Sequence, residues 1–129
     1  MKNIQLTCAH ALIKYLIAQK TLIDGKKVPL FPGVFGIFGH GNVACLGQAL
    51  QENQKDLPTW RGHHEQNMAL TGIAYSRAKR RKQIFIATSS VGPGSTNMIT
   101  AAAVAMSNRI PILFLPGDTF ANRMPDPVL

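Results

Sequence analysis

Hydrophobic residues recur every three or four positions in several stretches of the chain, the spacing that places them on one face of a helix. This period predicts a first helix that follows Thr7, a residue able to cap it, and ends near Gln19. It predicts further helices over 43–51, over 62–82 and, rich in alanine, over 98–106. Each of these helices can bury an apolar face against a sheet.

Short continuous apolar runs separate the helices. The runs at 34–38, 84–87 and 110–115 are rich in β-branched and aromatic residues, which predicts strands buried on both faces. Residues 57–61 predict a shorter strand. This alternation of strands and helices predicts an α/β domain with a doubly wound parallel sheet between two helical layers.

Segments rich in glycine and proline connect these elements. Asp24-Gly25 predicts a turn, and 26–32 and 116–129 predict connectors without regular structure. Glycine-rich loops follow two of the strands, at 39–42 and 88–97, and their glycines permit positive φ angles and a close approach of the backbone to a ligand. Since ligands of such sheets bind outside the carboxyl ends of the strands, both loops are expected at the binding edge.

Composition and charge argue against several function classes. The 129 residues suffice for one domain, and 14 basic against 6 acidic residues give a net charge of +8. Five basic residues lie within 77–82 without interleaved aromatic residues, so nucleic-acid binding is not expected. His10 and Lys14 interrupt the first apolar run, which argues against a signal peptide, and no apolar run has membrane-spanning length. We expect a cytoplasmic protein in which Cys8 and Cys45 are buried free thiols without metal-ligand spacing.

Glu65 lies in the first turn of the helix expected over 62–82, and it is the only acidic residue between Asp56 and Asp118. The simplest interpretation is that its charge complements the positive N-terminus of that helix. The start of this helix also reaches the sheet edge that carries both glycine loops. Three polar clusters at one edge are more than packing requires, which indicates a ligand site.

The glycine loops match nucleotide-binding motifs poorly. Gly39-x-Gly41-x-x-Ala44 has the spacing of a dinucleotide fingerprint, but no acidic residue ends a convincing second strand to bind a ribose. A P-loop is excluded because Gly-Lys-Ser/Thr does not occur in the sequence. Thr88, Ser89 and Ser90 can equally serve as caps and turn formers.

Three motifs in a fixed order resemble one family. They are Gly39-His-Gly-Asn42, Glu65-Gln66-Asn67-Met-Ala and Thr88-Ser-Ser-Val-Gly-Pro-Gly-Ser-Thr-Asn97. Together with the proline-flanked strand at 110–115, they resemble the pyrimidine-binding domain of thiamine diphosphate enzymes, from Leu6 onward. The resemblance implies thiamine diphosphate as the cofactor and the three-layer fold of that domain.

The same resemblance implies roles for individual residues. Glu65 matches the carboxylate that hydrogen-bonds the aminopyrimidine ring of the cofactor, and His40 is expected to transfer protons near the substrate; these are the expected catalytic residues. His63 and His64 are further candidates near the substrate. The expected cofactor contacts are Gly39, Gly41, Asn42, Glu65, Thr88, Ser89, Gly92, Pro93, Gly94 and Asn97.

The resemblance further implies that the chain is part of a longer subunit. In the family, a second domain holds the diphosphate and Mg²⁺ through a Gly-Asp-Gly…Asn signature that this sequence lacks, so no metal ligands are expected here. Residues 1–129 are therefore expected to be an N-terminal pyrimidine-binding domain, inactive alone. It would meet the diphosphate-binding domain of a partner subunit in a homodimer or larger homo-oligomer. The expected association surface is 92–106, with Ala102 and Ala105 on it, together with the neighbouring helix that holds Glu65.

Within the family, the segments 38–42, 87–105 and 115–129 are most similar to enzymes of myo-inositol breakdown that hydrolyse a carbon–carbon bond of a cyclic trihydroxy-dione. The implied substrate is a small carbohydrate-derived molecule. Two alternatives stay open. The parent protein could be a carboligase of the acetohydroxyacid synthase kind or a 2-oxoacid decarboxylase, or the chain could be a binding or assembly module without catalysis.

Overall fold

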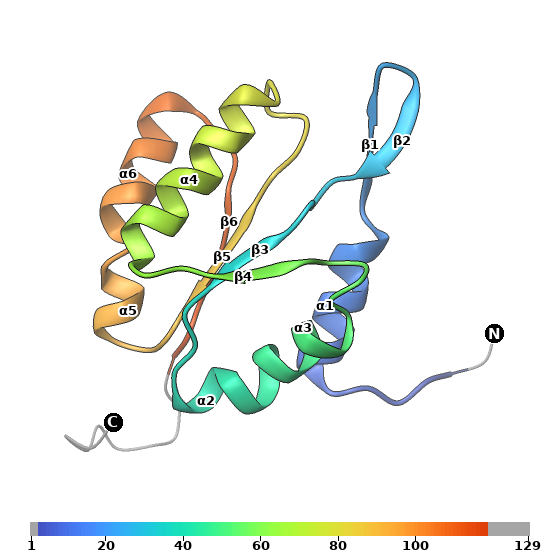
Figure 1. Cartoon of the computed structure of the whole chain (residues 1–129), viewed down its shortest axis with the longest axis vertical. Coiled ribbons are helices and arrows are strands. Elements are labelled where there is room, and N and C mark those ends of the chain that lie inside the picture. Colours follow the sequence, from blue (N-terminus) through green and yellow to red (C-terminus); the bar gives the residue numbers. More distant parts are fainter. Residues whose placement is uncertain (1–2, 119–129) are drawn as a thin grey trace.

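The computed structural model describes residues 3–118, which form a sheet with helices on both faces (Figure 1). The helical segments are α1 (Cys8–Ala18), α2 (His40–Asn42), the π-helical turn η1 (Val43–Gly47), α3 (Gln48–Glu52), α4 (Glu65–Ala78), α5 (Pro93–Thr96) and α6 (Ile99–Asn108). The strands are β1 (Lys20–Ile23), β2 (Lys26–Pro29), β3 (Val34–Gly36), β4 (Thr59–Arg61), β5 (Ile86–Ser89) and β6 (Leu113–Pro116). None of the helices in the described part of the chain is long and apolar enough to cross a membrane.

The main sheet has four parallel strands in the order β4-β3-β5-β6. Val34 of β3 pairs with Thr59 of β4 on one side and with Ile86 of β5 on the other. The chain therefore adds β4 on one side of β3, crosses back through α4, and then adds β5 and β6 on the other side. The carboxyl ends of β3 and β5 form the switch point of this sheet, the place where α/β proteins bind ligands.

Strand side chains alternate between two apolar cores on opposite faces of the sheet. One core lies against α1 and the helical segment 40–52, and the other lies against α4 and α6. The first includes Ile13, Leu16, Leu46, Leu50 and Ile86, and the second includes Ala69, Ile73, Ala87, Ala101 and Ala105. This arrangement confirms the doubly wound, three-layer α/β fold predicted from the sequence.

The first helix begins and ends where its sequence predicts. Thr7 caps α1, because its Oγ1 accepts a hydrogen bond from the backbone N–H of His10 at 3.2 Å, and the helix ends before Gln19. The prediction that Cys8 and Cys45 are buried is wrong, although both thiols are free. Both cysteines are exposed because the buried positions of these helices are filled by other residues, such as Ile13 and Leu16 in α1.

The predicted connector at 26–32 is wrong over its first part, because 26–29 forms β2. Strands β1 and β2 pair antiparallel, with Ile23 opposite Lys26, and form a hairpin that stands away from the main body (Figure 1). Asp24 and Gly25 have φ angles of 49° and 76°. Positive φ at both central residues is the geometry of the two-residue turns that suit the twist of a hairpin.

Several predicted boundaries also need correction. The helix expected over 62–82 ends at Ala78, and the basic residues beyond it form a turn. The loop expected over 88–97 is shorter, because β5 continues through Ser89 and α5 forms a helical turn within the remainder. The helix expected from residue 43 begins at His40. The connector expected over 116–129 lies almost entirely outside the described residues.

Candidate functional site

The two glycine loops meet at the switch point between β3 and β5. The side-chain amide Nδ2 of Asn42 donates a hydrogen bond to the backbone oxygen of Ser89 at 2.9 Å. Gly39 has a φ of −115°, which any residue can adopt, so its backbone angle does not require glycine. A Cβ at Gly39 would lie 2.5 Å from the Cβ of Ser90, so only glycine lets the two loops approach this closely.

The second loop turns sharply into α5 and α6. Gly92 has a positive φ of 68°, the conformation that glycine adopts without steric cost. Pro93 follows as the first residue of α5, a position where its missing N–H is not needed. The backbone N–H of Thr96 then donates to the oxygen of Gly92 at 3.0 Å. The loop is thereby held with Gly94 on its inner side and Asn97 at its end.

Glu65 is the first residue of α4, and its carboxylate reaches the second loop. Its Oε2 accepts a hydrogen bond from Nδ2 of Asn97 at 3.0 Å. Its Oε1 faces Gly94, where a Cβ would lie 3.2 Å from this oxygen and would collide with Oγ of Ser90. The carboxylate is half-buried and lies at the positive end of the α4 dipole. Among residues 3–118, the single ion pair found joins His10 to Glu52, so no cation in this range neutralises Glu65.

Thr88 and Ser89 are fully buried, and their hydroxyl groups serve the packing of the loop. Oγ1 of Thr88 donates to the oxygen of Leu115 at 2.8 Å, and Oγ of Ser89 donates to the oxygen of Ser90 at 3.2 Å. Ser95, which sequence reasoning did not single out, donates to the oxygen of Ser90 at 2.7 Å. These bonds rigidify the second loop beside Glu65.

His40 lies beside Ser90, apart from the contacts that Glu65 makes with Asn97 and Gly94. It is exposed at the start of α2 and lines a small hollow of about 20 Å³ together with Gly39, Asn42, Ser90, Val91, Gly117 and Asp118. The expected site residues therefore fall into two groups, one around His40 and one around Glu65. Ser90 lies between the two groups, because a Cβ at either Gly39 or Gly94 would collide with its side chain. His63 and His64 are exposed and directly precede α4.

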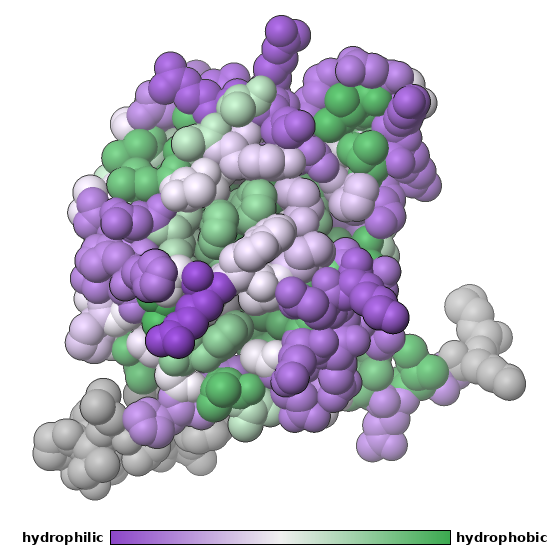
Figure 2. All heavy atoms as spheres, viewed as in Figure 1, coloured by the Kyte–Doolittle hydropathy of each residue, from purple (hydrophilic) through white to green (hydrophobic). Residues whose placement is uncertain are grey.

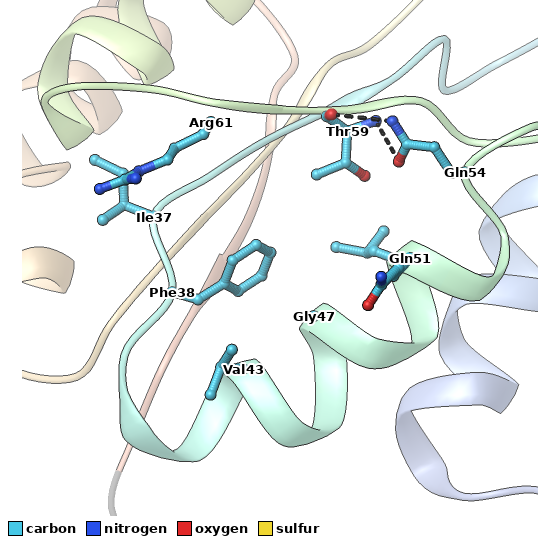
Figure 3. Close-up of a pocket in the computed structure, with 9 residues that line it drawn as sticks. Ile37, Phe38, Val43, Gly47, Gln51, Gln54, Thr59 and Arg61 are labelled. Carbon is cyan, nitrogen blue, oxygen red and sulfur yellow. Dashed lines mark hydrogen bonds between the residues drawn. The ribbon is translucent and has the colours of Figure 1, made fainter.

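A larger hollow of about 830 Å³ opens beside the first loop, between the end of β4 and the helical segment 40–52 (Figure 3). Phe38 points into it from the end of β3, and Val43 faces it from the helix. Arg61 lies at its edge as the last residue of β4. Figure 2 shows green hydrophobic surface and pale surface of intermediate hydropathy between purple margins on this side of the molecule. This hollow was not predicted from the sequence. Its one local signal is Arg61, a basic residue that ends a short strand.

The group around Glu65 has the chemistry to bind a flat nitrogen heterocycle. One carboxylate oxygen is fixed by Asn97, which leaves Oε1 to share a proton with a ring nitrogen. Gly92 has open space where a side chain would lie, so a ring can approach its backbone closely. The described residues include no group of three or more histidine, cysteine or acidic side chains that could hold a metal ion.

Comparisons with known proteins show which family the chain resembles. Residues 32–125 match a family model described as "Thiamine pyrophosphate enzyme, N-terminal TPP binding domain". The chain is 54% identical over 129 residues to a 3D-(3,5/4)-trihydroxycyclohexane-1,2-dione hydrolase of Clostridium tetani and 55% identical to one of Geobacillus thermodenitrificans, in both cases across its whole length. It is 52% identical over 128 residues to one of Listeria innocua. The chain spans only 20% of the length of each of these relatives.

Proposed function

The chain belongs to the thiamine pyrophosphate enzymes as an N-terminal TPP-binding domain, and from this premise we propose that it supplies the pyrimidine-side half of a thiamine diphosphate site, with Glu65 as the catalytic carboxylate. The observation that supports this most directly is the position of Glu65. It begins α4 beside the switch point, with one oxygen held by Asn97 and the other facing Gly94.

In this proposal, Glu65 holds a proton at Oε1 and exchanges it with a ring nitrogen of the aminopyrimidine. Thiamine diphosphate, when bound, supplies the nucleophilic carbon and the electron sink for the reaction. Asn97 orients the carboxylate through Oε2. Gly92, Pro93 and Gly94 would line the ring through their backbone.

The remaining expected contacts would position the first loop. Gly39, Gly41 and Asn42 would face the cofactor from the end of β3, with Asn42 held by its bond to Ser89. Thr88 and Ser89 would act indirectly, because their buried hydroxyls are bonded within the chain. His40 is exposed at the same edge, and its imidazole would transfer protons to and from the substrate.

We further propose that the parent protein is a hydrolase that acts on a small carbohydrate-derived ring in inositol degradation in the cytoplasm. The names of the relatives support a cyclic trihydroxy-dione as the substrate. Water would be consumed as a carbon–carbon bond beside a carbonyl breaks; the hydroxyl joins the carbonyl carbon to form an acid, and the proton joins the released carbon. The diphosphate and Mg²⁺ would be held by a domain of a partner subunit, so this chain alone would be inactive.

The second candidate is a carboligase of the acetohydroxyacid synthase kind or a 2-oxoacid decarboxylase on the same fold. It is favoured by nothing in the described geometry beyond the Glu65 group, which such enzymes would also require. In a non-catalytic binding or assembly module, Glu65 would serve only the positive N-terminus of α4 and its hydrogen bond with Asn97. Turnover of pyruvate in place of a cyclic dione by the parent protein would replace the first candidate with the second.

The test is Glu65→Gln in the full-length parent protein, which keeps the shape of the side chain but cannot exchange a proton. We expect turnover at saturating thiamine diphosphate to fall by about 10²–10⁴-fold, the usual worth of a positioned acid–base group. Glu52→Gln, which alters an exposed carboxylate of α3, is the matched control and should leave turnover unchanged. Near-normal turnover of the Glu65→Gln protein would remove Glu65 from the catalytic role.

A further inference from the structure

A second concave site lies at the opposite end of α4 from Glu65. The C-terminal ends of α4 and α6 lie side by side there (Figure 1), and a hollow of about 310 Å³ opens between them. We call it the arginine hollow; it is lined by Arg77, Arg80, Arg81, Asn108 and Ile110. Since α4 has 14 residues, about 21 Å of helix separates this hollow from the catalytic carboxylate.

The guanidinium of Arg81 is fixed in the wall of the hollow. Its Nε donates to the backbone oxygen of Arg109 at 2.9 Å, and its Nη2 donates to that of Asn108 at 3.3 Å. These are free carbonyls at the end of α6, so Arg81 caps that helix. A guanidinium has five N–H donors, and these two bonds leave others for a ligand.

Three arginines near the hollow adopt positive φ angles, which glycine adopts at a lower energetic cost. Arg80, Arg81 and Arg109 have φ angles of 52°, 64° and 52°. A non-glycine residue in this left-handed region costs about 1–2 kcal/mol. Strain of this kind gathers at sites where the side chain has a use, so it points to a function for this turn.

The charge around the hollow is not balanced within the described residues. Arg77, Lys79, Arg80, Arg81 and Lys82 follow one another closely, yet the ion pair between His10 and Glu52 is the single one found in residues 3–118. The ends of α4 and α6 each offer only about half a negative charge. Strongly hydrophilic side chains accordingly cover the upper rim of the molecule in Figure 2, over these helix ends. An anion in the hollow would relieve the repulsion among the cations.

We propose that the arginine hollow binds the phosphoryl group of a small phosphorylated metabolite. Arginine forks match the oxygens of phosphate in pairs, and three of them line one concavity. A volume of about 310 Å³ suits a small molecule, and Ile110 provides an apolar wall for its organic part. The same features do not favour an acidic protein segment, which would require an extended surface. This inference does not depend on the proposed function of the Glu65 site.

The experiment is a titration of the full 129-residue chain with inorganic pyrophosphate at about 0.15 M salt. We expect saturable binding by calorimetry and shifts in the Nε–H resonances of Arg77, Arg80 and Arg81. The double variant Arg77→Gln/Arg80→Gln should weaken binding at least about tenfold, because two charged forks are lost. Arg81 is left intact, since its removal would uncap α6.

The matched control is Lys26→Gln/Lys27→Gln, which removes the same charge from the exposed strand β2. It should leave pyrophosphate binding unchanged, and the melting temperatures of both variants should stay near that of the original chain. Absence of saturable binding, or equal weakening by the control, would overturn the proposal. So would a glutamate-rich peptide that shifts the same arginine resonances when pyrophosphate does not, because the surface would then be a protein contact.

Discussion

At Gly94, the missing side chain makes room for Oγ of Ser90 beside the proposed catalytic carboxylate. We predict that Gly94→Ala will destabilise the chain by about 1–3 kcal/mol, the usual cost of overpacking. The added methyl group would meet Oγ of Ser90 and approach Oε1 of Glu65. Cofactor binding by the parent protein should weaken for the same reason. Urea unfolding and cofactor titration measure the two effects.

Gly47 provides the control for this substitution. A Cβ there would lie 3.4 Å from the backbone oxygen of Asn42, which is ordinary contact, and the residue is helical. Gly47→Ala should therefore stabilise the chain by about 0.5–1 kcal/mol, because it lowers the backbone entropy of the unfolded state. If both variants change stability in the same direction, the close packing of Gly94 against Ser90 and Glu65 does not require glycine.

Glu52 gives the chain an acid-sensitive contact between α3 and α1. Hydrogen bonds from Gln48 at 3.0 Å and from His10 at 2.8 Å lower the pKa of its carboxyl below the ordinary value of 4.5. A folded-state pKa below the unfolded one means that the contact stabilises the fold above about pH 4.5 and is lost as the pH falls through the folded value. Glu52→Gln should flatten this part of the pH dependence. Urea midpoints measured from pH 6 to pH 3 will check it, and parallel curves for both proteins would contradict it.

Single residues were predictable from the sequence where local chemistry decides their role. Thr7 caps a helix because its hydroxyl can reach the first turn, and Glu65 begins a helix as its charge favours. Burial depends instead on which side of an element meets the sheet. The sequence did not reveal that Cys45 faces solvent, nor that the hydroxyl of Ser89 is enclosed. The sequence marked Ser90 only as a turn former and did not reveal that it lies between the two halves of the site.

Among the elements, β4 has an exposed edge that one side chain protects. Nε2 of Gln54 donates to the backbone oxygen of Thr59 at 3.2 Å, and the N–H of Thr59 donates to Oε1 of Gln54 at 3.1 Å. The amide thus occupies the positions that a further strand would use. Gln54→Ala should cost about 1–2 kcal/mol, for two hydrogen bonds of ordinary strength.

Hydrogen exchange offers a direct readout of this protection. The amide proton of Thr59 should exchange faster in Gln54→Ala. Gln51→Ala changes another exposed side-chain amide, which like Gln54 lines the hollow of about 830 Å³, and it should not affect this exchange. Unchanged exchange at Thr59 would show that the pairing with Gln54 does not protect the edge.

The elements that the sequence predicted well are those with a strong period or a long apolar run. The helix around Ile73 and the strand around Ile86 are clear for this reason. The hairpin β1–β2 was missed because its strands are only four residues long and neither shows a clear alternation of polar and apolar residues. Its turn at Asp24-Gly25 was the usable signal. Boundaries shifted where turns, such as the left-handed one at Arg80, end an element earlier than its composition suggests.

For the whole molecule, α6 presents an apolar stripe away from the sheet. Ile99, Ala103 and Met106 recur at helical spacing and are exposed, Met106 by 81%. We predict that the chain self-associates through this stripe, as a two-fold dimer. Met106→Glu should shift it to monomer in sedimentation equilibrium, because a charge would be buried without a partner.

Thr100→Glu is the control, since it adds the same charge to an exposed position of α6 beside the stripe. It should preserve the dimer. Ala105, which the sequence suggested as a surface position, is 7% exposed and belongs to the second core, so Ala105→Glu would unfold the chain. A monodisperse monomer at high concentration of the original chain would end this prediction.

The central place of β3 also sets an order of events during synthesis. Its partner on one side, β4, is made soon after it, whereas Ile86 of β5 follows much later in the chain. At about 5–20 residues per second, translation leaves β3 with one unpaired edge for several seconds. During that interval the unpaired strand edge makes the nascent chain most prone to aggregate with other chains. Slow codons between β4 and β5 should therefore lower the yield of folded protein more than slow codons after β6.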